Sequence, residues 1–483
     1  MNKWNTTMKL PELLDSLKTT TEIVIVEKNK HITGEDFYSQ VISTSKTLKQ
    51  LGIHNNTPVL IKLNNSIDSV IILFAIIHAG GVAFLANHFE PIGKTANTIE
   101  KFGIAYLVSD KVTTVGVREK LNKTYLSQVH STFSRSFFLT DYSVNEYKPS
   151  KVHPNFNNAQ IAIFSSGTTG DPKVILNTFE NHLNNAKLHA KAIGLQKNDH
   201  VACILPIYYS YGLVASLLAS LLVGCTIFLS PPNHPLDADW MNINHITVIA
   251  LTPFFAQSLS FNTPTLRVIT LGGDVLSIAI AKHLRASFPN VELYSTYGLT
   301  EAGPRVATWR FDNIDLPSTN IAPLGVPLDG VELSIQSSNN DHKFGELIVT
   351  TPTSMIGYYY GIEQEAIIID NTIATGDIFE RINENLHFSS RSKSVIVQNG
   401  EKIFPPVIES IISAINGVYD VRVSAQKDII KGEIASAEIL AQDNVSVNDI
   451  KKVLLQQLPY SSLPSNIEFV KEISRNFTGK LPR

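Results

Sequence analysis

Cysteine is scarce in this chain, which has only Cys203 and Cys225 among 483 residues. Two cysteines cannot form a disulfide framework or a metal-ligand cluster, so they predict a protein of a reducing compartment, and we expect the cytoplasm. The N-terminal segment, MNKWNTTMKLPELLDS, also lacks the continuous apolar core of a secretory signal. Both absences speak against a secreted, disulfide-stapled protein.

An excess of one charge is missing as well, since 40 Lys and Arg face 43 Asp and Glu for a formal net charge of -3. Nucleic acid and anionic membranes attract proteins through a basic excess, so we expect neither as a partner. The hydrophobic fraction of 43% is typical of a globular protein with a large core. At about 150 residues per domain, the length suggests roughly three structural units.

Charge is absent from one long segment, because residues 202–236 contain no Lys, Arg, Asp or Glu. Its middle, 212–229, reads GLVASLLASLLVGCTIFL and matches the length of about 18 apolar residues that can span a membrane. No basic cluster flanks it to set an orientation, however, and Gly224 divides it into pieces of ordinary helix and strand length. We therefore predict a buried helix, a turn at Gly224 and a buried strand, and no membrane span.

Short apolar strands alternate with amphipathic or apolar helices through the first two thirds of the chain, which favours parallel sheets covered by helices. The fold class expected is α/β. A large N-terminal domain (residues 1–390) of parallel-rich sheets flanked by helices includes a small β-rich subdomain at about 325–390, and an α+β C-terminal domain (391–483) follows. The expected helices are 37–52, 66–79, 406–415 and 447–458, and the expected strands are 58–63, 82–85, 104–108, 201–205, 225–229, 248–251, 268–271, 331–335, 346–349, 386–388, 419–424 and 434–440.

The segment 161–173, IAIFSSGTTGDPK, places a loop rich in glycine and hydroxyl groups directly after an apolar strand. Glycines let backbone N–H groups converge on one point, and hydroxyls and a lysine add further donors, which suits a polyphosphate. The loop differs from the common P-loop, because Asp171 and Pro172 separate Gly170 from Lys173. By composition alone it is also compatible with an ordinary turn. Its candidate phosphate-binding residues are Ser165, Ser166, Gly167, Thr168, Thr169, Gly170 and Lys173.

The string SSGTTGDPK resembles the phosphate-loop signature of the adenylate-forming (AMP-binding) superfamily: acyl- and aryl-CoA synthetases, peptide synthetase adenylation domains and firefly-type luciferases. The family's other motifs follow in order, so the resemblance spans essentially the whole chain, although each motif alone could be an ordinary turn. They are GGD at 272–274, STYGLTEAG at 295–303, GEL at 345–347, GY at 357–358, TGD at 375–377, SRSKSVIVQNGEKIFPPVIE at 390–409 and TGK at 478–480.

The resemblance implies a role for each matching residue. Gly272, Gly273 and Asp274 would form the adenine-side loop. Tyr297, followed by Gly298, would stack on adenine, Thr300 would contact phosphate, and Glu301 would hold Mg²⁺; an aromatic face, a hydroxyl and a carboxylate within five residues suit a base, a phosphate and a metal. The remaining roles are the ribose hydroxyls for Asp377, ribose or phosphate for Arg391, the hinge of a mobile C-terminal domain for Lys393, the pantetheine tunnel for Gly400, and the acyl carboxylate and phosphate for Lys480.

The implied activity is ATP- and Mg²⁺-dependent conversion of a carboxylic acid to acyl-AMP, followed by transfer to a thiol. Because the sequence stops soon after Lys480, we expect the thiol to come from CoA or from a separate phosphopantetheinyl carrier protein. An acyl-AMP ligase that loads a carrier without CoA is the alternative enzyme, and a degenerate nucleotide-binding protein is the alternative without activity.

The acid is expected to bind near 206–212, PIYYSYG, which resembles the family's acyl-pocket motif. Amino-acid-activating members place an aspartate in this region, and none occurs here, so an α-amino acid is disfavoured. Tyr208, Tyr209 and Tyr211 would suit an aryl or a short-to-medium acyl group, while plain core packing explains them equally well.

The sequence departs from the family pattern at several positions. Val174 and Ser390 replace the usual glycines, Val397 replaces a common lysine, and the usual Pro-Lys-Thr near the C-terminal lysine motif reads Ser474-Arg475-Asn476. None of these changes removes a charged group from the adenylation step. Ser390 and Val397 concern the second half-reaction rather than the first.

Overall fold

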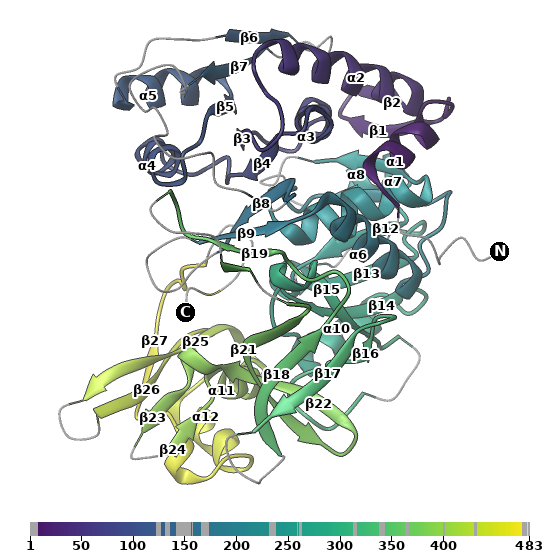
Figure 1. Cartoon of the computed structure of the whole chain (residues 1–483). Helices are drawn as coiled ribbons and strands as arrows, with labels where there is room; N and C mark the ends of the chain where they lie inside the picture. The colour runs from purple at the N-terminus through teal and green to yellow at the C-terminus, as the bar shows by residue number, and fades with distance from the viewer. Residues whose placement is uncertain are drawn as a thin grey trace.

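The structure of the chain is a computed structural model. It describes residues 8–121, 127–130, 136–141, 156, 158–165, 173–230, 238–257, 259, 263–312, 316–337, 343–362, 367–368, 370–398, 401–428, 432–475 and 481. Four β-sheets organise these residues: two of nine strands, one of four and one of five. In the view of Figure 1, β3 to β7 of the first large sheet lie at the upper left, β12 to β16 of the second lie at the middle right, and the C-terminal unit lies at the bottom.

The first large sheet has a parallel centre, in which β3 pairs with β4 and β5, and β4 pairs with β8. β8 and β9 are antiparallel, with Phe164 opposite Val174, so the candidate phosphate loop joins two neighbouring strands. In order across the sheet the strands are β20 (Ile367–Ile368), β19 (Gly357–Tyr359), β9 (Val174–Asn177), β8 (Ile161–Phe164), β4 (Val82–Leu85), β3 (Pro58–Lys62), β5 (Tyr106–Ser109), β7 (Ser136–Asp141) and β6 (Ser127–His130).

The second large sheet is parallel from β1 through β14 and antiparallel at both edges. Most of its parallel strands are short and apolar on both faces, as expected for a sheet covered by helices, whereas β14 also carries Glu292, Ser295 and Thr296. In order the strands are β16 (Val326–Pro327), β15 (Arg305–Arg310), β14 (Glu292–Gly298), β13 (Val268–Gly272), β12 (Val248–Leu251), β10 (His200–Cys203), β11 (Thr226–Leu229), β1 (Ile23–Glu27) and β2 (Lys30–Thr33).

A layer of helices fills the space between the two large sheets and forms the largest core. It contains α2 (Gly34–Gln50), α3 (Ile67–Ala79), α6 (Phe179–Ala192), η1 (Gly212–Leu218) and α7 (Ala219–Val223). Phe74 of α3 packs edge-on against Phe37 and Phe179, with ring centroids 5.3 Å apart in both pairs. Because sheets lie on both sides of it, α3 is apolar on nearly every face.

Other helices cover the outer faces of the sheets. α4 (Ile92–Phe102) and α5 (Lys111–Leu121) cover the first sheet, and α8 (Ala238–Ile243), α9 (Pro253–Ala256) and α10 (Ile278–Ser287) cover the second. The short α1 (Leu10–Leu17) packs into the central core through Leu10, Leu13, Leu14 and Leu17. The expected α/β class, with parallel-rich sheets flanked by helices, is confirmed.

The described part of the uncharged segment, residues 202–230, is mostly buried, as predicted from its missing basic flanks. It forms β10, a helix, a left-handed turn at Gly224 (φ +84°) and β11. The helix differs from expectation in starting as the π-helix η1 and continuing as the α-helix α7. Among the described residues, no helix is both long and apolar enough to cross a membrane.

Short antiparallel strands follow the second sheet, as the predicted β-rich subdomain requires. They are β17 (Glu332–Gln336), β18 (Phe344–Thr350), β21 (Thr372–Ile382) and β22 (Asn385–Arg391). β22 ends at Arg391 and a short turn, η3 (Ser392–Ser394), leads onward. The domain boundary predicted at 390/391 therefore falls at the end of a strand.

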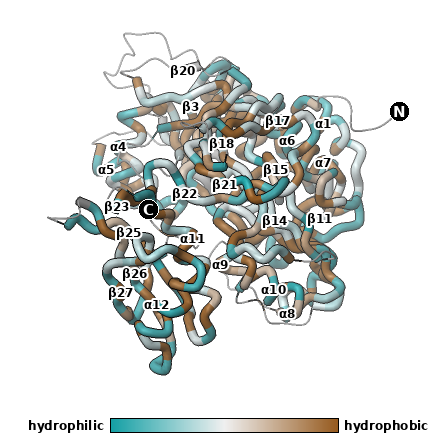
Figure 2. Tube along the Cα trace, turned by 90° about the horizontal axis from the view of Figure 1, so that it is seen from below, coloured by the Kyte–Doolittle hydropathy of each residue, from teal (hydrophilic) through white to brown (hydrophobic). Residues whose placement is uncertain are grey.

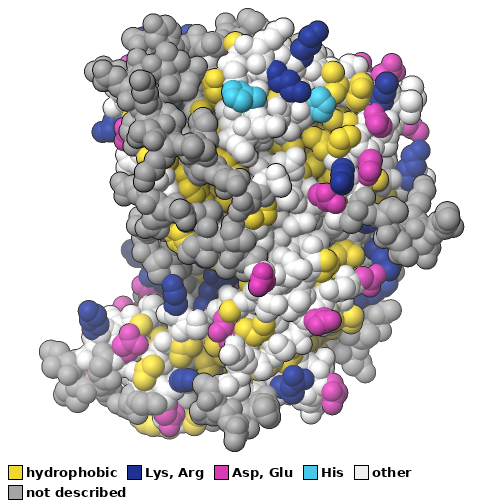
Figure 3. Space-filling view, in the orientation of Figure 1, with side chains coloured by type: hydrophobic (Ala, Val, Ile, Leu, Met, Phe, Trp, Pro, Cys, Tyr) yellow, Lys and Arg dark blue, Asp and Glu magenta, His cyan; other side chains and the backbone are white. Residues whose placement is uncertain are grey.

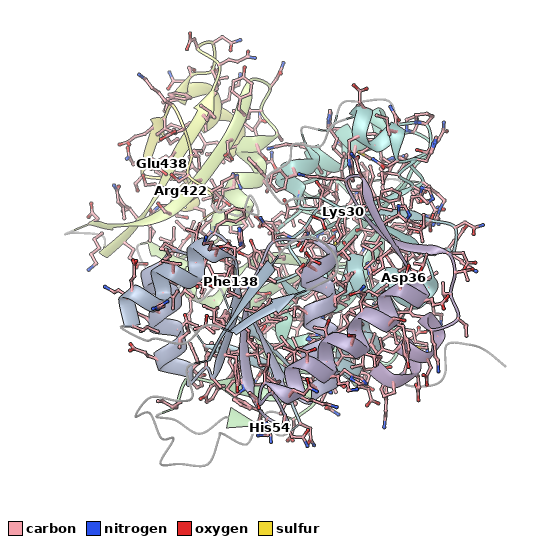
Figure 4. All side chains as sticks on the ribbon, turned by 90° about the horizontal axis from the view of Figure 1, so that it is seen from above. Lys30, Asp36, His54, Phe138, Arg422 and Glu438 are labelled. Carbon is pink, nitrogen blue, oxygen red and sulfur yellow. The ribbon has the colours of Figure 1, made fainter. Side chains whose placement is uncertain are left out.

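The C-terminal unit has its own apolar core and projects from the larger body in Figure 2. Across β25 and β26, Arg422 faces Glu438, with 2.5 Å between the guanidinium and the carboxylate (Figure 4). Its elements are β23 (Ile396–Gln398), β24 (Glu401–Ile403), α11 (Pro405–Ser413), β25 (Val418–Asp428), β26 (Gly432–Ala441), α12 (Val447–Leu455), η4 (Tyr460–Ser462) and β27 (Asn466–Phe469).

Polar and aromatic side chains contact each other between the two bodies. The Asn320 amide donates to Gln457 Oε1 at 2.7 Å. The guanidinium carbon of Arg475 lies 4.6 Å from the ring centroid of Phe254, and the rings of Phe344 and Phe404 stack at 5.7 Å. These contacts hold the two bodies in the observed arrangement.

Candidate active site

A cavity of about 460 Å³ lies where the ends of β8 and β14 meet the β-rich subdomain and the turn η3. Positions at the carboxyl ends of parallel strands are the usual binding sites of open α/β sheets. The cavity brings together predicted site residues from segments far apart in the sequence: Ser165, Lys173, Tyr209, Tyr211, Gly273, Gly298, Thr300, Glu301, Arg391 and Lys393.

A cation and a carboxylate lie side by side in this cavity. Lys173, just before β9, places Nζ 3.9 Å from Oε1 of Glu301, which lies in the turn η2 (Thr300–Ala302) after β14. The same ammonium lies 3.5 Å from the ring centroid of Tyr358, and the Tyr358 hydroxyl donates to Glu301 Oε1 at 3.2 Å. Partial burial lowers the pKa of Lys173, and Glu301 opposes that shift. This pair can meet both a phosphate and its metal ion.

The neighbouring residues of the STYGLTEAG segment are held tightly. Thr300 Oγ1 lies 2.8 Å from the Ser210 hydroxyl. Gly298 has no room for a side chain, because an added Cβ would lie 1.9 Å from the backbone oxygen of Pro304. This close approach of two backbone segments explains the glycine and fixes the path from β14 into η2.

Asp377, Tyr297 and Arg391 form a connected group beside the cavity. The Tyr297 hydroxyl donates to Asp377 Oδ2 at 2.7 Å, and Arg391 Nε lies 3.0 Å from Asp377 Oδ1. Asp377 is 3% exposed, and burial raises its pKa although Arg391 and Tyr297 pull it down. Of the three, Arg391 lines the cavity. Tyr297 packs edge-on against Phe379, with ring centroids 5.4 Å apart.

The three tyrosines of the PIYYSYG segment do not share one environment. Tyr209 and Tyr211 line the cavity, and the Tyr211 hydroxyl donates to the backbone oxygen of Thr270 at 3.3 Å. Tyr208 instead belongs to the central core, with its ring 4.8 Å from that of Tyr209. Tyr208 therefore lies in the core and not in the lining of this cavity, and its role in binding the acid stays a prediction.

The three residues of the predicted adenine-side loop also differ in their environments, and one of them lines the cavity. Gly273 (φ +83°) lines the cavity, whereas Gly272 is buried at the end of β13 against Thr296 Oγ1, 2.6 Å from where a Cβ would lie. Asp274 is exposed and accepts a hydrogen bond from the Val275 backbone N–H at 2.8 Å. Neither Gly272 nor Asp274 contributes to the lining.

Part of the predicted site cannot be placed. Seven predicted residues lie outside the described residues: Ser166, Gly167, Thr168, Thr169, Gly170, Gly400 and Lys480. Their roles stay predictions. The described residues also contain no group of three or more His, Cys, Asp or Glu side chains arranged to hold a metal ion.

Some residues of the site were missed by the motif analysis. Arg305, two residues beyond the STYGLTEAG motif, is 3% exposed and lines the cavity. Ser210, Tyr358 and Glu346 also line it. Tyr358 and Glu346 lie in motifs that were singled out without roles, so their position could have been anticipated. No motif pointed to Arg305.

Charged side chains of both signs are scattered over the face drawn in Figure 3, without a broad patch of one sign. This distribution agrees with the near-neutral net charge of -3. It offers no electrostatic footprint for a nucleic acid on that face.

The sequence model of the AMP-binding enzyme family matches residues 15–359, which include the phosphate-loop, GGD and STYGLTEAG motifs. The chain belongs to this family. The match confirms the class of activity expected from the motifs, an AMP-forming acid–thiol ligase that activates a carboxylic acid with ATP.

Among its relatives is the 2-succinylbenzoate–CoA ligase of Oceanobacillus iheyensis, 26% identical over 95% of this chain and 94% of the relative. The 4-coumarate–CoA ligase 3 of Arabidopsis thaliana is 24% identical over 98% and 89%. The o-succinylbenzoate–CoA synthetase of Bacillus subtilis, solved with its acyl-adenylate intermediate, superposes with a TM-score of 0.78 at 20% identity, covering 98% of this chain and 96% of that one. At that identity the structural likeness shows the fold.

Proposed function

We propose that this enzyme is a CoA ligase for an aryl carboxylic acid, with 2-succinylbenzoate as the first candidate. The observation that carries the proposal is one cavity with charged groups of both signs, Lys173 and Glu301, and with the aromatic side chains Tyr209 and Tyr211 in its wall. Such a lining suits a nucleotide triphosphate joined to an aromatic acid. The names of the relatives, aryl-acid CoA ligases from bacteria and a plant, support the same substrate class and acceptor.

In the first half-reaction a carboxylate oxygen of the acid attacks the α-phosphorus of ATP, the bond to the bridging oxygen breaks, and pyrophosphate leaves. This step needs alignment and neutralised charge more than covalent catalysis. Lys173 and Thr300 contact the phosphates, together with Thr168 and Thr169 of the loop. Lys480 steadies the attacked phosphorus and the incoming carboxylate.

Glu301 would hold Mg²⁺. Magnesium is commonly bound by one or two carboxylates together with substrate phosphates, and Glu301 offers a carboxylate next to a phosphate-binding lysine. The ion supplies charge neutralisation on the triphosphate when bound. Tyr358 keeps the Glu301 carboxylate oriented through its hydroxyl.

The nucleoside is held beside Asp377, whose carboxylate accepts the two ribose hydroxyls, while Arg391 contacts ribose or phosphate. Tyr297 stacks on adenine, and Gly273 and Gly298 allow the base to approach the backbone. In the second half-reaction the thiol sulfur of CoA attacks the acyl carbon and AMP leaves. The C-terminal domain turns about Lys393 between the two steps, and the pantetheine arm enters past Gly400.

The test is pyrophosphate release with ATP and Mg²⁺ over a panel of acids: 2-succinylbenzoate, 4-coumarate, benzoate, a medium-chain fatty acid and an α-amino acid, with hydroxylamine present to trap the adenylate. We expect release and hydroxamate with the aryl acids, and a CoA ester after CoA is added. Equal or better activity with the amino acid would contradict the substrate class. Release with hydroxamate but no ester with CoA would favour a carrier protein as the acceptor.

The proposed location is the cytoplasm. The two cysteines, Cys203 and Cys225, are both buried free thiols, which suits a reducing compartment. Fractionation of cells that make the protein would test this, with recovery in the membrane pellet as the contradicting result.

A further inference from the structure

Arg305 carries a buried positive charge without a carboxylate partner among the described residues. It opens β15 and is 3% exposed, and its Nε atom is buried without a hydrogen-bond partner. By contrast, five other arginines each lie against a carboxylate: Arg267, Arg310, Arg391, Arg422 and Arg475. An unpaired buried charge is costly, so a site that retains one gains from a ligand that neutralises it.

The guanidinium lies in the wall of the active-site cavity. Its Cζ is 4.2 Å from the ring centroid of Tyr211, and Tyr211, Gly273 and Arg305 all line the cavity. One terminal nitrogen donates to Thr296 Oγ1 at 2.6 Å and lies over Gly272, where an added Cβ would be 2.9 Å away. A larger residue at Gly272 would displace the guanidinium.

The position of Arg305 is fixed from its backbone side as well. Asn185 of α6 accepts a hydrogen bond from the Arg305 N–H at 2.7 Å and donates to the Arg305 carbonyl at 2.8 Å. His189, one turn further along α6, is fully buried, and burial together with the nearby Arg305 charge lowers its pKa to about 3. His189 is therefore neutral and adds no second positive charge beside Arg305. The arginine is held firmly with donors still available, as a preorganised anion site requires.

We propose that Arg305 binds a second carboxylate of the acid that this enzyme activates, at the end of the cavity lined by Tyr211. This inference rests on the proposed function. It identifies the substrate class as an aromatic acid with two carboxylates, one activated by ATP and the other paired with the guanidinium. The planar fork of arginine suits a carboxylate, and the Tyr211 ring beneath it keeps water from the pair.

The experiment compares 2-succinylbenzoate with its two monoacids, in which either the ring carboxylate or the chain carboxylate is replaced by an uncharged group. Adenylate formation is measured for wild type, Arg305→Met and Arg305→Lys. Wild type should prefer the diacid over the better monoacid by roughly 10²-fold in kcat/KM, as expected when a buried charge loses its partner. Arg305→Met should bring this ratio to about one. Arg305→Lys should retain part of the preference for the diacid, because the positive charge stays but the paired N–H donors of the guanidinium are lost.

Arg310→Met is the matched control, because Arg310 lies on the same strand but pairs with Asp312 on the surface; its diacid-to-monoacid ratio should equal that of wild type. Thermal midpoints and ATP binding report whether each variant is folded.

If Arg305→Met does not fold, an unchanged ratio in Arg305→Lys overturns the inference. The inference is also overturned if Arg305→Met lowers kcat/KM equally for all three acids, or if wild type prefers a monoacid. Either result leaves the proposed ligase function intact. Wild type without activity on any acid of either panel would instead refute the proposed function, and this inference with it.

Discussion

At the scale of single residues, the group of Tyr297, Asp377 and Arg391 predicts a pH dependence of nucleotide binding. Asp377 must be ionised to accept the ribose hydroxyls, and burial raises its pKa above that of an ordinary carboxyl group. Nucleotide binding should therefore weaken as the pH falls through this raised pKa, at a higher pH than an exposed aspartate would give. The Tyr297 hydroxyl, 2.7 Å from Asp377 Oδ2, favours the ionised form.

Tyr297→Phe keeps an aromatic face for adenine but removes that donor, so the pKa of Asp377 should rise further. We expect the acidic limb of AMP binding to move up by about one pH unit, since a hydrogen bond to a charged group contributes about 1.5–3 kcal/mol. The measurement is the Kd of AMP against pH. Tyr294→Phe is the control, because Tyr294 lies on the same strand and donates to Glu292. Identical profiles for wild type and Tyr297→Phe would refute the coupling.

Which residues could be predicted depended on whether they lie in a recognisable motif. Lys173 and Glu301 lie in motifs and meet in the cavity. Arg305 could not be identified in the sequence, because in RVATWR it looks like the polar end of a strand. Its place in the cavity wall depends on Asn185, which is 120 residues away in sequence, and on Thr296 of the neighbouring strand β14, and both reach it only in the folded chain. Tyr208 and Tyr209 are neighbours of one type, and only packing separates core from cavity.

At the scale of elements, α6 positions β15 through Asn185, a buried amide that bonds to both backbone groups of Arg305 and to Thr353 Oγ1 at 3.0 Å. Asn185→Ala leaves those backbone groups without partners inside the protein. It should destabilise the protein by about 2–4 kcal/mol and lower kcat/KM for the diacid. Thermal unfolding and steady-state kinetics check both effects.

The control for that change lies on the same helix. Lys191 forms an exposed ion pair with Asp329, and such surface pairs contribute about 0–1 kcal/mol. Lys191→Ala should therefore behave nearly as wild type. If Asn185→Ala were as stable as Lys191→Ala, α6 would not hold the strand in the way described.

The elements themselves were largely predictable, whereas their arrangement was not. Alternating apolar runs identified β3, β4, β12 and β13 nearly to the residue, because short parallel strands are apolar on both faces. The order of strands across each sheet depends on contacts between distant segments, for example β1 beside β11. Nothing in the apolar segment 212–218 distinguishes a π-helix from an α-helix, since both bury the same side chains.

At the scale of the whole molecule, the two half-reactions should depend on different parts of the chain. Lys480→Ala should abolish most adenylate formation, by roughly 10²–10³-fold in rate, because one preorganised cation is lost. ATP binding should stay nearly intact, since Lys173 and Arg391 remain. Supplied with ready-made acyl-AMP and CoA, the variant should still form the thioester. Adenylate formation at a near-normal rate would show that Lys480 has another role.

A second prediction at this scale concerns rotation of the C-terminal unit. The contact between Asn320 and Gln457, 2.7 Å long, joins the two bodies and must break if that unit turns about Lys393. Asn320→Cys with Gln457→Cys would allow a short bis-maleimide to link them, and the native cysteines are buried. The linked enzyme should keep one half-reaction and lose overall ester formation, because a fixed unit serves one arrangement of the site.

Each single-cysteine variant, treated with the same reagent, is the control and should retain overall turnover. Adenylate formation and thioester formation from ready-made acyl-AMP, measured separately on the linked enzyme, identify which step the observed arrangement supports. Full overall turnover in completely linked protein would mean that both half-reactions occur without rotation. In that case CoA would have to reach the adenylate while Arg391 and Lys393 keep their present positions in the cavity wall.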